Sequence, residues 1–448
     1  MMRIRSAVVA ACCAVVLVAC GVQGGSGSGG TAVKGSGSEF KPSTSGPIKI
    51  GVLITDTRAE AERNGVSVVS PYKAAAHAMI QAVNTGGGVA ERKLEVVDET
   101  IDFSTPNFDS AFEAICQRFT KDKQVQAVVY DGLIYNQAFN KCLMTAGVPI
   151  LYMGQNGSPI GDDTDLKDNP GVIAVNAVSI DRRVKSIMNK AVEAKFLASG
   201  SKLGVVIEDC PYNERAYENT LKPLADKAGV ELVKSEIKCA HGYADNGPNL
   251  AQVQSLALKF KSQAVDSVMI MTLYENGIIY YFAQGAHAQN WSPQYLLFHP
   301  QGMADVMKLY PPDQLTKMRG FGGMPDQDVT EPPAPPAEQA KVRKSCIDNA
   351  RSNGVPVQKI TDQIVIYQAC DVVRLLQQGL ANSGGLGGID KLVPRIEKIG
   401  TGFVSALTLD GATQFGPDRH DGMEKTAASS FDPGCKCFTY KSAPAPVG

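Results

Sequence analysis

The sequence has almost no net charge, few histidines and no familiar catalytic motif. Its 44 lysine and arginine residues nearly balance 45 aspartate and glutamate residues, so the composition predicts no nucleic acid or other polyanion as a partner. The five histidines are scattered without the spacing of metal ligands, and we expect no metal site. GxSxG, HExxH and GxxxxGK[ST] motifs are all missing. A triad assembled in space needs no local motif, but nothing in the sequence favours an enzyme.

Long hydrophobic runs are also scarce. Only Ala7–Ala19, near the start of the chain, is apolar over a long stretch, and Arg3 and Arg5 precede it. The run is too short for a permanent membrane span, and this arrangement is typical of a secretory signal. We therefore expect residues 1–19 to be removed, and we expect the mature chain not to span the membrane.

The signal ends in Leu17-Val18-Ala19-Cys20, which closely resembles the lipobox of bacterial lipoproteins. In such proteins the cysteine becomes the N-terminus and carries a diacylglyceryl group, and two acyl chains anchor the protein stably where one would not. The resemblance implies lipidation at Cys20 and a location on the extracytoplasmic face of the bacterial cell membrane. The alternative is an ordinary secretory signal with an incidental cysteine.

Residues 20–46 are rich in glycine and serine, which predicts a flexible tether between the lipid anchor and a folded body. About 390 residues remain after signal, tether and tail are set aside, more than one hydrophobic core usually serves, so we expect two lobes.

Beyond the tether, strand and helix patterns alternate in two series. In the first series we expect strands at 48–54, 93–97, 125–130 and 148–153, helices at 66–83, 108–120 and 136–145, and an acidic loop at 98–102. In the second we expect helices at 181–199, 214–228, 249–262 and 276–288, and strands at 202–207, 231–238, 267–271 and 295–298. Helices at 338–353 and 361–380 and a last strand at 437–440 follow. This alternation predicts α/β architecture with parallel sheets and right-handed crossovers.

Four stretches resemble the leucine/isoleucine/valine-binding group of periplasmic-type solute-binding proteins, which serve ABC importers. They are Ile48–Thr55, Asn84–Glu95, Gly147–Ile150 and Asp209–Tyr212. The resemblance extends over about residues 47 to 440. It implies two doubly wound parallel-sheet lobes joined by a three-crossing hinge, the type I periplasmic binding fold, with a small solute held between the lobes. It also implies an ABC permease with its ATPase subunits as partner, no cofactor and no enzymatic activity.

The hinge crossings are expected near Asn176, near His299 and at 416–421. These crossings would divide the chain into an N-terminal lobe of residues 47–175 plus 299–418, a C-terminal lobe of residues 176–298 plus 419–441, and a tail of residues 442–448.

The resemblance also implies where solute binds, namely in loops at the ends of strands. Tyr212 and Tyr274 match cleft tyrosines of the family, whereas Gln301 stands where amino-acid binders place a carboxylate for the ligand ammonium. An amide carries no charge, and charge-assisted hydrogen bonds are roughly twice as strong as neutral ones. Glu275 could supply the carboxylate that Gln301 lacks. The simpler interpretation of Glu275 is an exposed residue at the start of a helix. The expected solute-binding residues are Thr55, Asp131, Ile134, Tyr135, Gln155, Asn156, Ser158, Tyr212, Tyr274, Glu275 and Gln301.

Eight of the eleven cysteines lie beyond Cys20, an even number that fits an oxidising, exported environment. Sequence alone leaves about a hundred pairings open, but sequence order favours local ones. The expected pairs are Cys116–Cys142, Cys210–Cys239 and Cys346–Cys370, and a Cys435–Cys437 pair is left open. In the last pair, an extended strand would separate the Cα atoms by about 6.5 to 7 Å, at the edge of disulfide geometry. A metal role for this pair is the weaker interpretation.

The identity of the solute is where the sequence is least informative. The tyrosines favour a partly apolar or planar molecule, although each of them could instead pack within a lobe. Gln301 argues against a free amino acid held by its ammonium. We expect a neutral or singly charged small metabolite, with a branched-chain or related amino acid as the alternative. A ligand-sensing lipoprotein of the same fold is the second functional interpretation.

Lipidation can be tested by detergent partition. Wild-type protein made in a bacterium that processes lipoproteins should enter the detergent phase, whereas the Cys20→Ala variant should stay in the aqueous phase because it cannot form the thioether. If both proteins remain aqueous, the lipobox interpretation is wrong.

Overall fold

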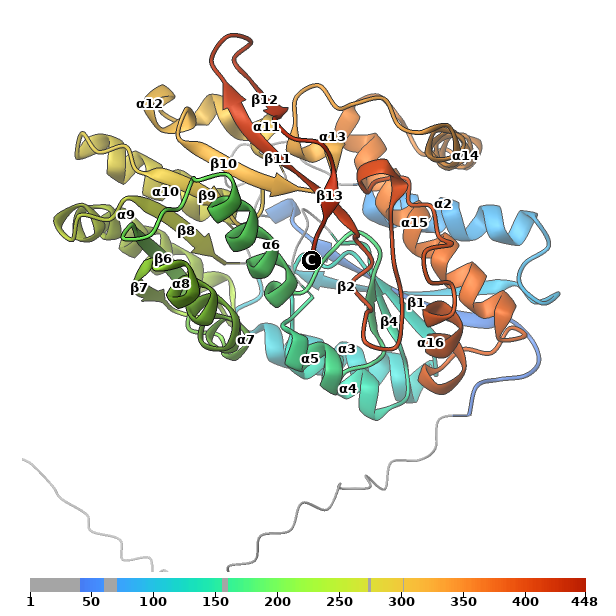
Figure 1. Cartoon of the computed structure of the whole chain (residues 1–448). Coiled ribbons are helices and arrows are strands. Elements are labelled where there is room, and N and C mark those ends of the chain that lie inside the picture. Colours follow the sequence, from blue (N-terminus) through green and yellow to red (C-terminus); the bar gives the residue numbers. More distant parts are fainter. Residues whose placement is uncertain (1–40, 60–70, 155–159, 273–274, 301) are drawn as a thin grey trace, which may run out of the picture. The chain divides into compact units, whose positions relative to one another are not determined.

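The computed structural model describes residues 41–59, 71–154, 160–272, 275–300 and 302–448 (Figure 1). Two β-sheets form the framework of the described residues. The first sheet is entirely parallel, in the order β2-β1-β3-β4-β5. Its strands are β1 (Ile48–Asp56), β2 (Leu94–Asp102), β3 (Ala127–Tyr130), β4 (Ile150–Tyr152) and β5 (Val172–Ala174).

The second sheet has the order β12-β11-β10-β9-β8-β6-β7. The strands from β10 to β7 are parallel, and an antiparallel hairpin of β11 and β12 extends the sheet beyond β10. Its strands are β6 (Lys202–Glu208), β7 (Glu231–Ile237), β8 (Ser267–Met271), β9 (Gln294–Leu297), β10 (Met318–Gly322), β11 (Lys425–Asp432) and β12 (Cys437–Tyr440), and the short β13 (Ala445–Pro446) pairs with β11.

Helices cover both faces of the first sheet. Ile48, Ile50 and Val52 of β1 are buried together with α2, α14 and α15, whereas Val128 and Tyr130 of β3 are buried together with α3 and α4 on the other face. Strand residues therefore alternate between two cores, as expected for a sheet buried on both sides. The helices are α2 (Tyr72–Thr85), α3 (Phe108–Gln117) with the π-helical turn Arg118–Asp122, α4 (Gln137–Thr145), α5 (Asp163–Asp168), α14 (Ala337–Ser352), α15 (Ile360–Asn382) and α16 (Ile389–Glu397).

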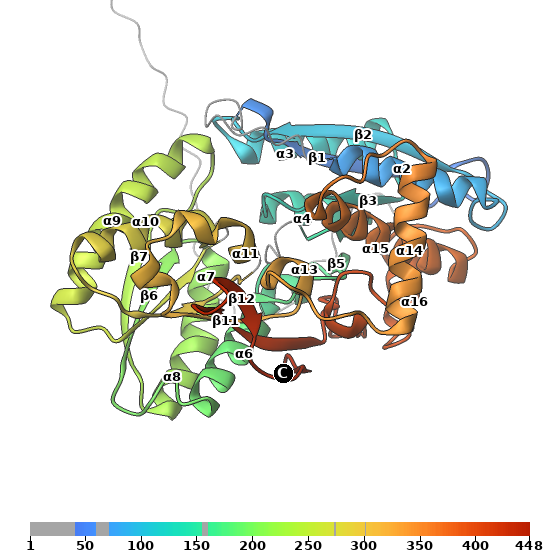
Figure 2. The ribbon, with the colours of Figure 1, turned by 90° about the horizontal axis from the view of Figure 1, so that it is seen from above.

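The second sheet is covered in the same way, with α9 and α10 on one face and α6, α7 and α8 on the other. Figure 2 shows α9 and α10 beside β6 and β7, and α14 and α16 among the elements of the first lobe. The helices are α6 (Ile180–Glu193), α7 (Pro211–Ala216) with the π-helical turn Tyr217–Leu221, α8 (Lys222–Ala228), α9 (Asn246–Ser262), α10 (Glu275–Ala288), α11 (Met303–Val306), α12 (Pro312–Leu315) and α13 (Pro325–Asp328). Short 3₁₀ turns occupy Tyr243–Asp245, Met307–Leu309 and Leu409–Gly411.

A glycine lets an aromatic ring rest on a central strand in each lobe. A Cβ at Gly51 of β1 would lie 2.9 Å from the Phe119 ring, and a Cβ at Gly204 of β6 would lie 2.8 Å from the Phe260 ring. Both rings are fully buried. Because packed cores leave no room for an added methyl group, alanine at either position would force the ring to move.

The predicted fold class, two doubly wound α/β lobes, is confirmed. Several boundaries differ from the prediction. The acidic stretch 98–102 is not a loop but the second half of β2, a sheet edge on which the exposed residues are mostly acidic or polar. The helix expected at 66–83 is seen as α2, and residues 66–70 lie outside the described residues. Strands β5, β10 and β11 were not predicted.

The expected second crossing near His299 is wrong. Strand β10 pairs with β9, so residues 299–322 belong with the second sheet and not with the N-terminal lobe. The chain returns to the first lobe only between β10 and α14. The third crossing agrees better with the expected 416–421, because the Ala174 N–H donates to the His420 carbonyl at 2.9 Å before β11 begins in the second sheet.

The three predicted disulfides are present, and Cys435 and Cys437, whose pairing the sequence left open, form a fourth. Cys435 and Cys437 lie with their Cα atoms 5.2 Å apart, closer than an extended strand would allow. The reason is that Cys435 and Lys436 belong to the turn between β11 and β12, and Lys436 has a left-handed backbone with φ of 55°.

None of the helices in the described residues is long and apolar enough to cross a membrane.

The Cys346–Cys370 disulfide joins α14 to α15 and closes a loop with a sequence separation of 24. On the chain-entropy estimate, replacing both cysteines with serine should lower the free energy of unfolding by about 3 kcal/mol. The matched Cys435→Ser/Cys437→Ser variant, with a separation of 2, should lose about half as much. Urea unfolding measures both values, and equal losses would contradict this ranking.

Candidate solute-binding site

Thr55 and Asp131 lie side by side at the carboxyl ends of β1 and β3. This is the edge of an open parallel sheet where loops gather and ligands bind. The Thr55 side chain donates from Oγ1 to Asp131 Oδ1 at 2.9 Å, and the Thr55 backbone N–H donates to Oδ2 at 2.6 Å. The Leu133 N–H donates to Oδ1 as well, at 3.2 Å. The two predicted solute-binding residues therefore hold each other, and Asp131 fixes the start of the loop that follows β3.

Asp131 is fully buried. Burial raises the pKa of Asp131 to about 6, although the donors from Thr55, Leu133 and Gly132 act in the opposite direction. The raised pKa means that the folded state binds a proton more tightly than the unfolded state. This carboxyl therefore favours folding below about pH 4, and that contribution is lost as the pH rises through about 6.

The Tyr130 side chain holds the loop that follows β3. Its hydroxyl donates to the Ile134 carbonyl at 2.9 Å and accepts from the Ile134 N–H at 3.0 Å. Ile134 and Tyr135, both predicted solute contacts, are buried. The loop is thus held through its backbone, which leaves its side chains to meet neighbouring elements.

Tyr135 meets the second lobe through Tyr212, at the start of α7. The two rings pack edge to face with centroids 5.3 Å apart, a favourable geometry for aromatic pairs. The Tyr135 hydroxyl donates to Asp165 Oδ2 at 3.0 Å. Two of the predicted tyrosines are therefore brought together from different lobes.

Three buried polar residues line up at the carboxyl ends of neighbouring strands in the second sheet, and sequence reasoning missed all three. Glu208 ends β6, and Thr272 and His299 follow β8 and β9. Continuing the strand register from the pairs Ile207↔Met271 and Met269↔Leu296 places the three in one row. A polar residue directly after a buried apolar strand is the signal that could have found them.

The electrostatics of this row are mixed. Burial and the positive charge of Arg183 lower the pKa of His299 well below its usual range, so its imidazole is neutral at pH 7. Thr272 Oγ1 has no hydrogen-bond partner within the part of the chain that the structure describes. Glu208 is 2% exposed. A carboxylate, a hydroxyl and a neutral imidazole together can both accept and donate hydrogen bonds.

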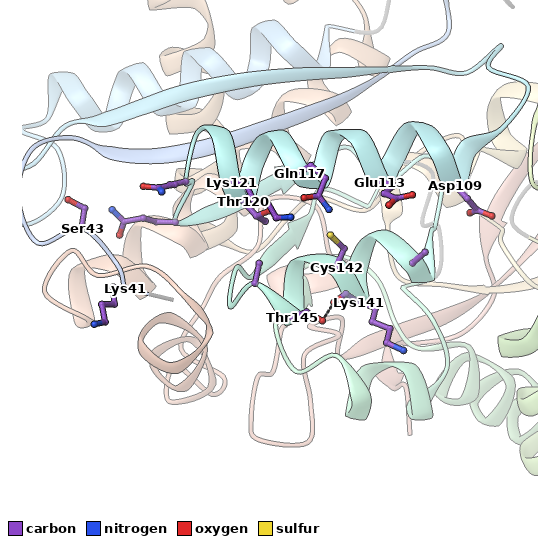
Figure 3. Close-up of a pocket in the computed structure, with 14 residues that line it drawn as sticks. Lys41, Ser43, Asp109, Glu113, Gln117, Thr120, Lys121, Lys141, Cys142 and Thr145 are labelled. Atoms are coloured by element: carbon purple, nitrogen blue, oxygen red, sulfur yellow. Dashed lines mark hydrogen bonds between the residues drawn. The ribbon is translucent and has the colours of Figure 1, made fainter. Parts of the chain in front are cut away.

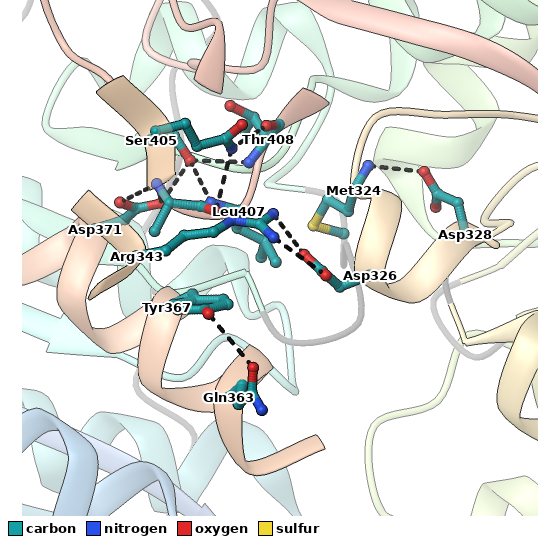
Figure 4. A network of polar contacts seen from close by, with 12 residues as sticks. Met324, Asp326, Asp328, Arg343, Gln363, Tyr367, Asp371, Ser405, Leu407 and Thr408 are labelled. Carbon is teal, nitrogen blue, oxygen red and sulfur yellow. Dashed lines mark hydrogen bonds and ion pairs between the residues drawn. The ribbon is translucent and has the colours of Figure 1, made fainter. Parts of the chain in front are cut away.

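Helix α13 lies in the second crossing and contacts both lobes, and Figure 4 shows its contact with Arg343. Asp326 forms a buried ion pair with Arg343 of α14, at 2.6 Å, in the first lobe. Asp328 accepts instead from the Tyr440 hydroxyl of β12 at 2.7 Å, in the second lobe. Burial raises the pKa of Asp328 to about 7, against the effect of its hydrogen bonds to Tyr440 and Met324.

A groove of about 840 Å³ lies along α3 and α4 (Figure 3). Charged and polar side chains such as Lys121, Glu113 and Lys141 line it, together with Lys41 and Ser43 from the start of the described chain. None of the predicted solute-binding residues lines this groove, so it is separate from the candidate site.

Several predicted residues cannot be placed. Gln155, Asn156, Ser158, Tyr274 and Gln301 lie outside the described residues, so their roles stay predictions. Glu275 begins α10, and its side chain is likewise not described. Across the described ranges, no group of three His, Cys, Asp or Glu side chains is placed to hold a metal ion.

The two parallel sheets, the helices on both faces of each and the candidate site at their strand ends define a two-lobed binding protein of the type I periplasmic fold. Residues 47–343 match the family described as periplasmic binding protein, and the chain belongs to that family. None of the curated proteins compared with the chain matches its sequence.

Solved structures share the fold at low identity. A solute-binding protein of an ABC transporter from Rhodopseudomonas palustris HaA2, in complex with p-hydroxybenzoic acid, has a TM-score of 0.63 and 14% identity over 90% of this chain and 97% of its own. An ABC transporter substrate-binding protein from Desulfitobacterium hafniense, in complex with Leu, has a TM-score of 0.57 and 17% identity over 88% and 99%. The branched-chain amino acid transporter substrate-binding protein LivJ from Streptococcus pneumoniae, with isoleucine, has a TM-score of 0.59 and 16% identity over 89% and 99%.

Thr55→Val should destabilise the protein in a pH-dependent way. At pH 7.5 the variant loses a hydrogen bond to an ionised carboxylate, which is worth about 1.5 to 3 kcal/mol. At pH 4.5 Asp131 is protonated in the folded state, and the loss should fall to about 1 kcal/mol. Urea unfolding without added solute measures both values.

Thr85→Val is the matched control, because Thr85 is an exposed residue at the end of α2 and its Oγ1 donates to the Gln81 carbonyl. It should cost little at either pH. An equal loss for Thr55→Val at both pH values would show that the Asp131 carboxyl is not the partner that matters.

Proposed function

We propose that this protein is an extracytoplasmic, lipid-anchored solute-binding protein that captures a small organic solute between its lobes and delivers it to an ABC importer. The observation that carries the proposal is the convergence of the two lobes at their strand ends, where Tyr135 of the first lobe packs against Tyr212 of the second. A solute enclosed there would contact both lobes, and its binding would favour the closed arrangement that a permease can recognise. The protein binds and releases its solute unchanged.

The side chains at the strand ends favour a solute with a planar or apolar part and a hydrogen-bonding end. Tyr135, Tyr212 and Phe298 provide aromatic surface, and Glu208, Thr272 and His299 provide polar atoms. A neutral or singly charged small metabolite fits this combination. Proteins of similar fold bind p-hydroxybenzoic acid in one complex and leucine in another, which supports a small organic acid as the solute.

A branched-chain or related amino acid remains the alternative solute. Gln301 lacks the charge that an ammonium would prefer, but Glu208 is a second candidate for that charge besides Glu275. A carboxylate at the end of β6 would reach an ammonium from β6 instead of from position 301. Both solute classes therefore place a hydrogen-bond donor against Glu208, a hydroxyl in one case and an ammonium in the other.

A ligand-sensing lipoprotein of the same fold is the second candidate function. It would bind solute in the same place but signal through a partner. Genes for two permeases and two ATPases beside this gene would support import, and a kinase or regulator gene would support sensing.

Titration calorimetry with 4-hydroxybenzoate and with L-leucine tests the solute class. We expect at least one of them to bind with micromolar affinity, about −8 kcal/mol. Glu208→Gln should weaken binding about ten- to a hundredfold, because a bond to a charged group is worth about 1.5 to 3 kcal/mol. Thermal-shift screening of amides, short acids and other aromatic acids extends the search around any hit.

Glu231→Gln is the matched control, because Glu231 is exposed at the opposite, amino end of β7, and it should leave affinity unchanged. Tight binding that survives Glu208→Gln would exclude Glu208 as the polar contact. Failure of every organic solute in the screen, or conversion of a bound solute into a product, would overturn the proposed function.

A further inference from the structure

Two separate segments of the second lobe contact the first lobe. One is the start of α7 and its flank, residues 210–217, after β6. The other is the turn at 239–243, after β7. The Cys210–Cys239 disulfide joins them directly, so these two contact segments belong to one covalently closed unit.

The first segment contributes Arg215 at the end of α7. Its guanidinium lies against α5 of the first lobe, with Nε 2.7 Å from Asp162 Oδ2 and Nη2 2.6 Å from Asp165 Oδ1. Asp162 is 2% exposed as a side chain, so this ion pair is shielded from solvent on the acidic side. A planar guanidinium is suited to holding carboxylates in this forked geometry. Tyr212, three residues earlier, packs on Tyr135.

The second segment contributes His241 and Gly242, which contact the start of α3 in the first lobe. The His241 carbonyl accepts from the Phe108 N–H at 2.9 Å, and His241 Nδ1 lies 3.4 Å from Asp109 Oδ2. A Cβ at Gly242 would lie 2.1 Å from the Pro106 carbonyl oxygen. The two backbones therefore approach as closely as only a glycine permits at this position.

The disulfide sits where it can hold both segments at once. Cys210 is the residue before α7, and Cys239 is two residues before His241. The Cys239 N–H also donates to Asp209, the neighbour of Cys210. By contrast, Cys346–Cys370 joins α14 to α15 in the core of the first lobe and connects neither of the two clasp segments.

We propose that the Cys210–Cys239 disulfide positions Tyr212, Arg215 and His241 as a clasp that keeps the second lobe against the first. Without the disulfide the two segments are free to move apart, and the contacts of α7 and of the 239–243 turn form independently of each other. Lobe contact then becomes less favourable, because each segment has to be ordered separately. Only one consequence rests on the proposed function, namely that the clasp slows the escape of a bound solute.

Amide hydrogen exchange at Phe108 measures the clasp directly and needs no solute. Phe108 is the first residue of α3, so its N–H has no acceptor within the helix, and its partner is the His241 carbonyl of the other lobe. We expect this amide to be protected in the wild-type chain, and to exchange about tenfold faster or more in Cys210→Ser/Cys239→Ser. The Phe112 amide, inside the same helix, should exchange at its wild-type rate.

Cys346→Ser/Cys370→Ser is the matched control, since it removes a disulfide of similar loop length without touching the clasp, and it should leave Phe108 protected. Arg215→Gln should raise Phe108 exchange to a smaller extent. If the Cys210→Ser/Cys239→Ser protein does not fold, mild reduction of the folded wild-type chain replaces it, because Cys239 is partly exposed. Peptide mapping must then show that Cys210–Cys239 is open and that Cys116–Cys142, which includes α3, is intact.

Three outcomes would overturn the clasp. These are an unprotected Phe108 amide in the wild-type chain, unchanged protection after loss of the Cys210–Cys239 bond, and equal acceleration in the Cys346→Ser/Cys370→Ser control. Because no solute is present, these outcomes are independent of the calorimetry, and a failed clasp leaves the proposed function standing.

Discussion

The common direction of the parallel strands is the constraint on which the rest of this structure depends. Every strand from β1 to β10 that pairs in parallel delivers its following loop to the same edge of its sheet. Thr55 and Asp131 reach that edge in the first lobe, and Glu208, Thr272 and His299 reach it in the second. Residues far apart in sequence are thus gathered without any local motif, which is why motif searches find nothing here.

The second crossing shows how a connection between lobes can be both short and firmly held. Asp326 and Asp328 stand two residues apart on α13, yet the first pairs with Arg343 in one lobe and the second with Tyr440 in the other. Breaking a buried pair by removing one partner leaves an uncompensated charge and is strongly destabilising. The backbone of the crossing is therefore held in place at α13. Bending between the lobes is expected in the segments on either side of this helix.

Strong local patterns made most of the fold predictable. The predicted bounds of the strand Ser267–Met271 agree with the structure at both ends, and the three predicted disulfides between neighbouring cysteines are present. The second crossing was misplaced because β10, Met318–Gly322, contains two glycines and an arginine in five residues and has no clear strand pattern. The candidate site was harder, since Glu208 looks like the polar end of a strand until the register places it beside Thr272.

The acidic edge of the first sheet has a consequence for self-association. Within the described part of the chain, strand β2 pairs only with β1, so its other side carries backbone groups that another chain could extend. Glu95, Asp98 and Asp102 line this strand, and two copies brought edge to edge would set like charges against each other. These acidic side chains, two of which lie in the stretch predicted as a loop, thus oppose intermolecular β-pairing. The repulsion weakens where salt screens the carboxylates or acid neutralises them.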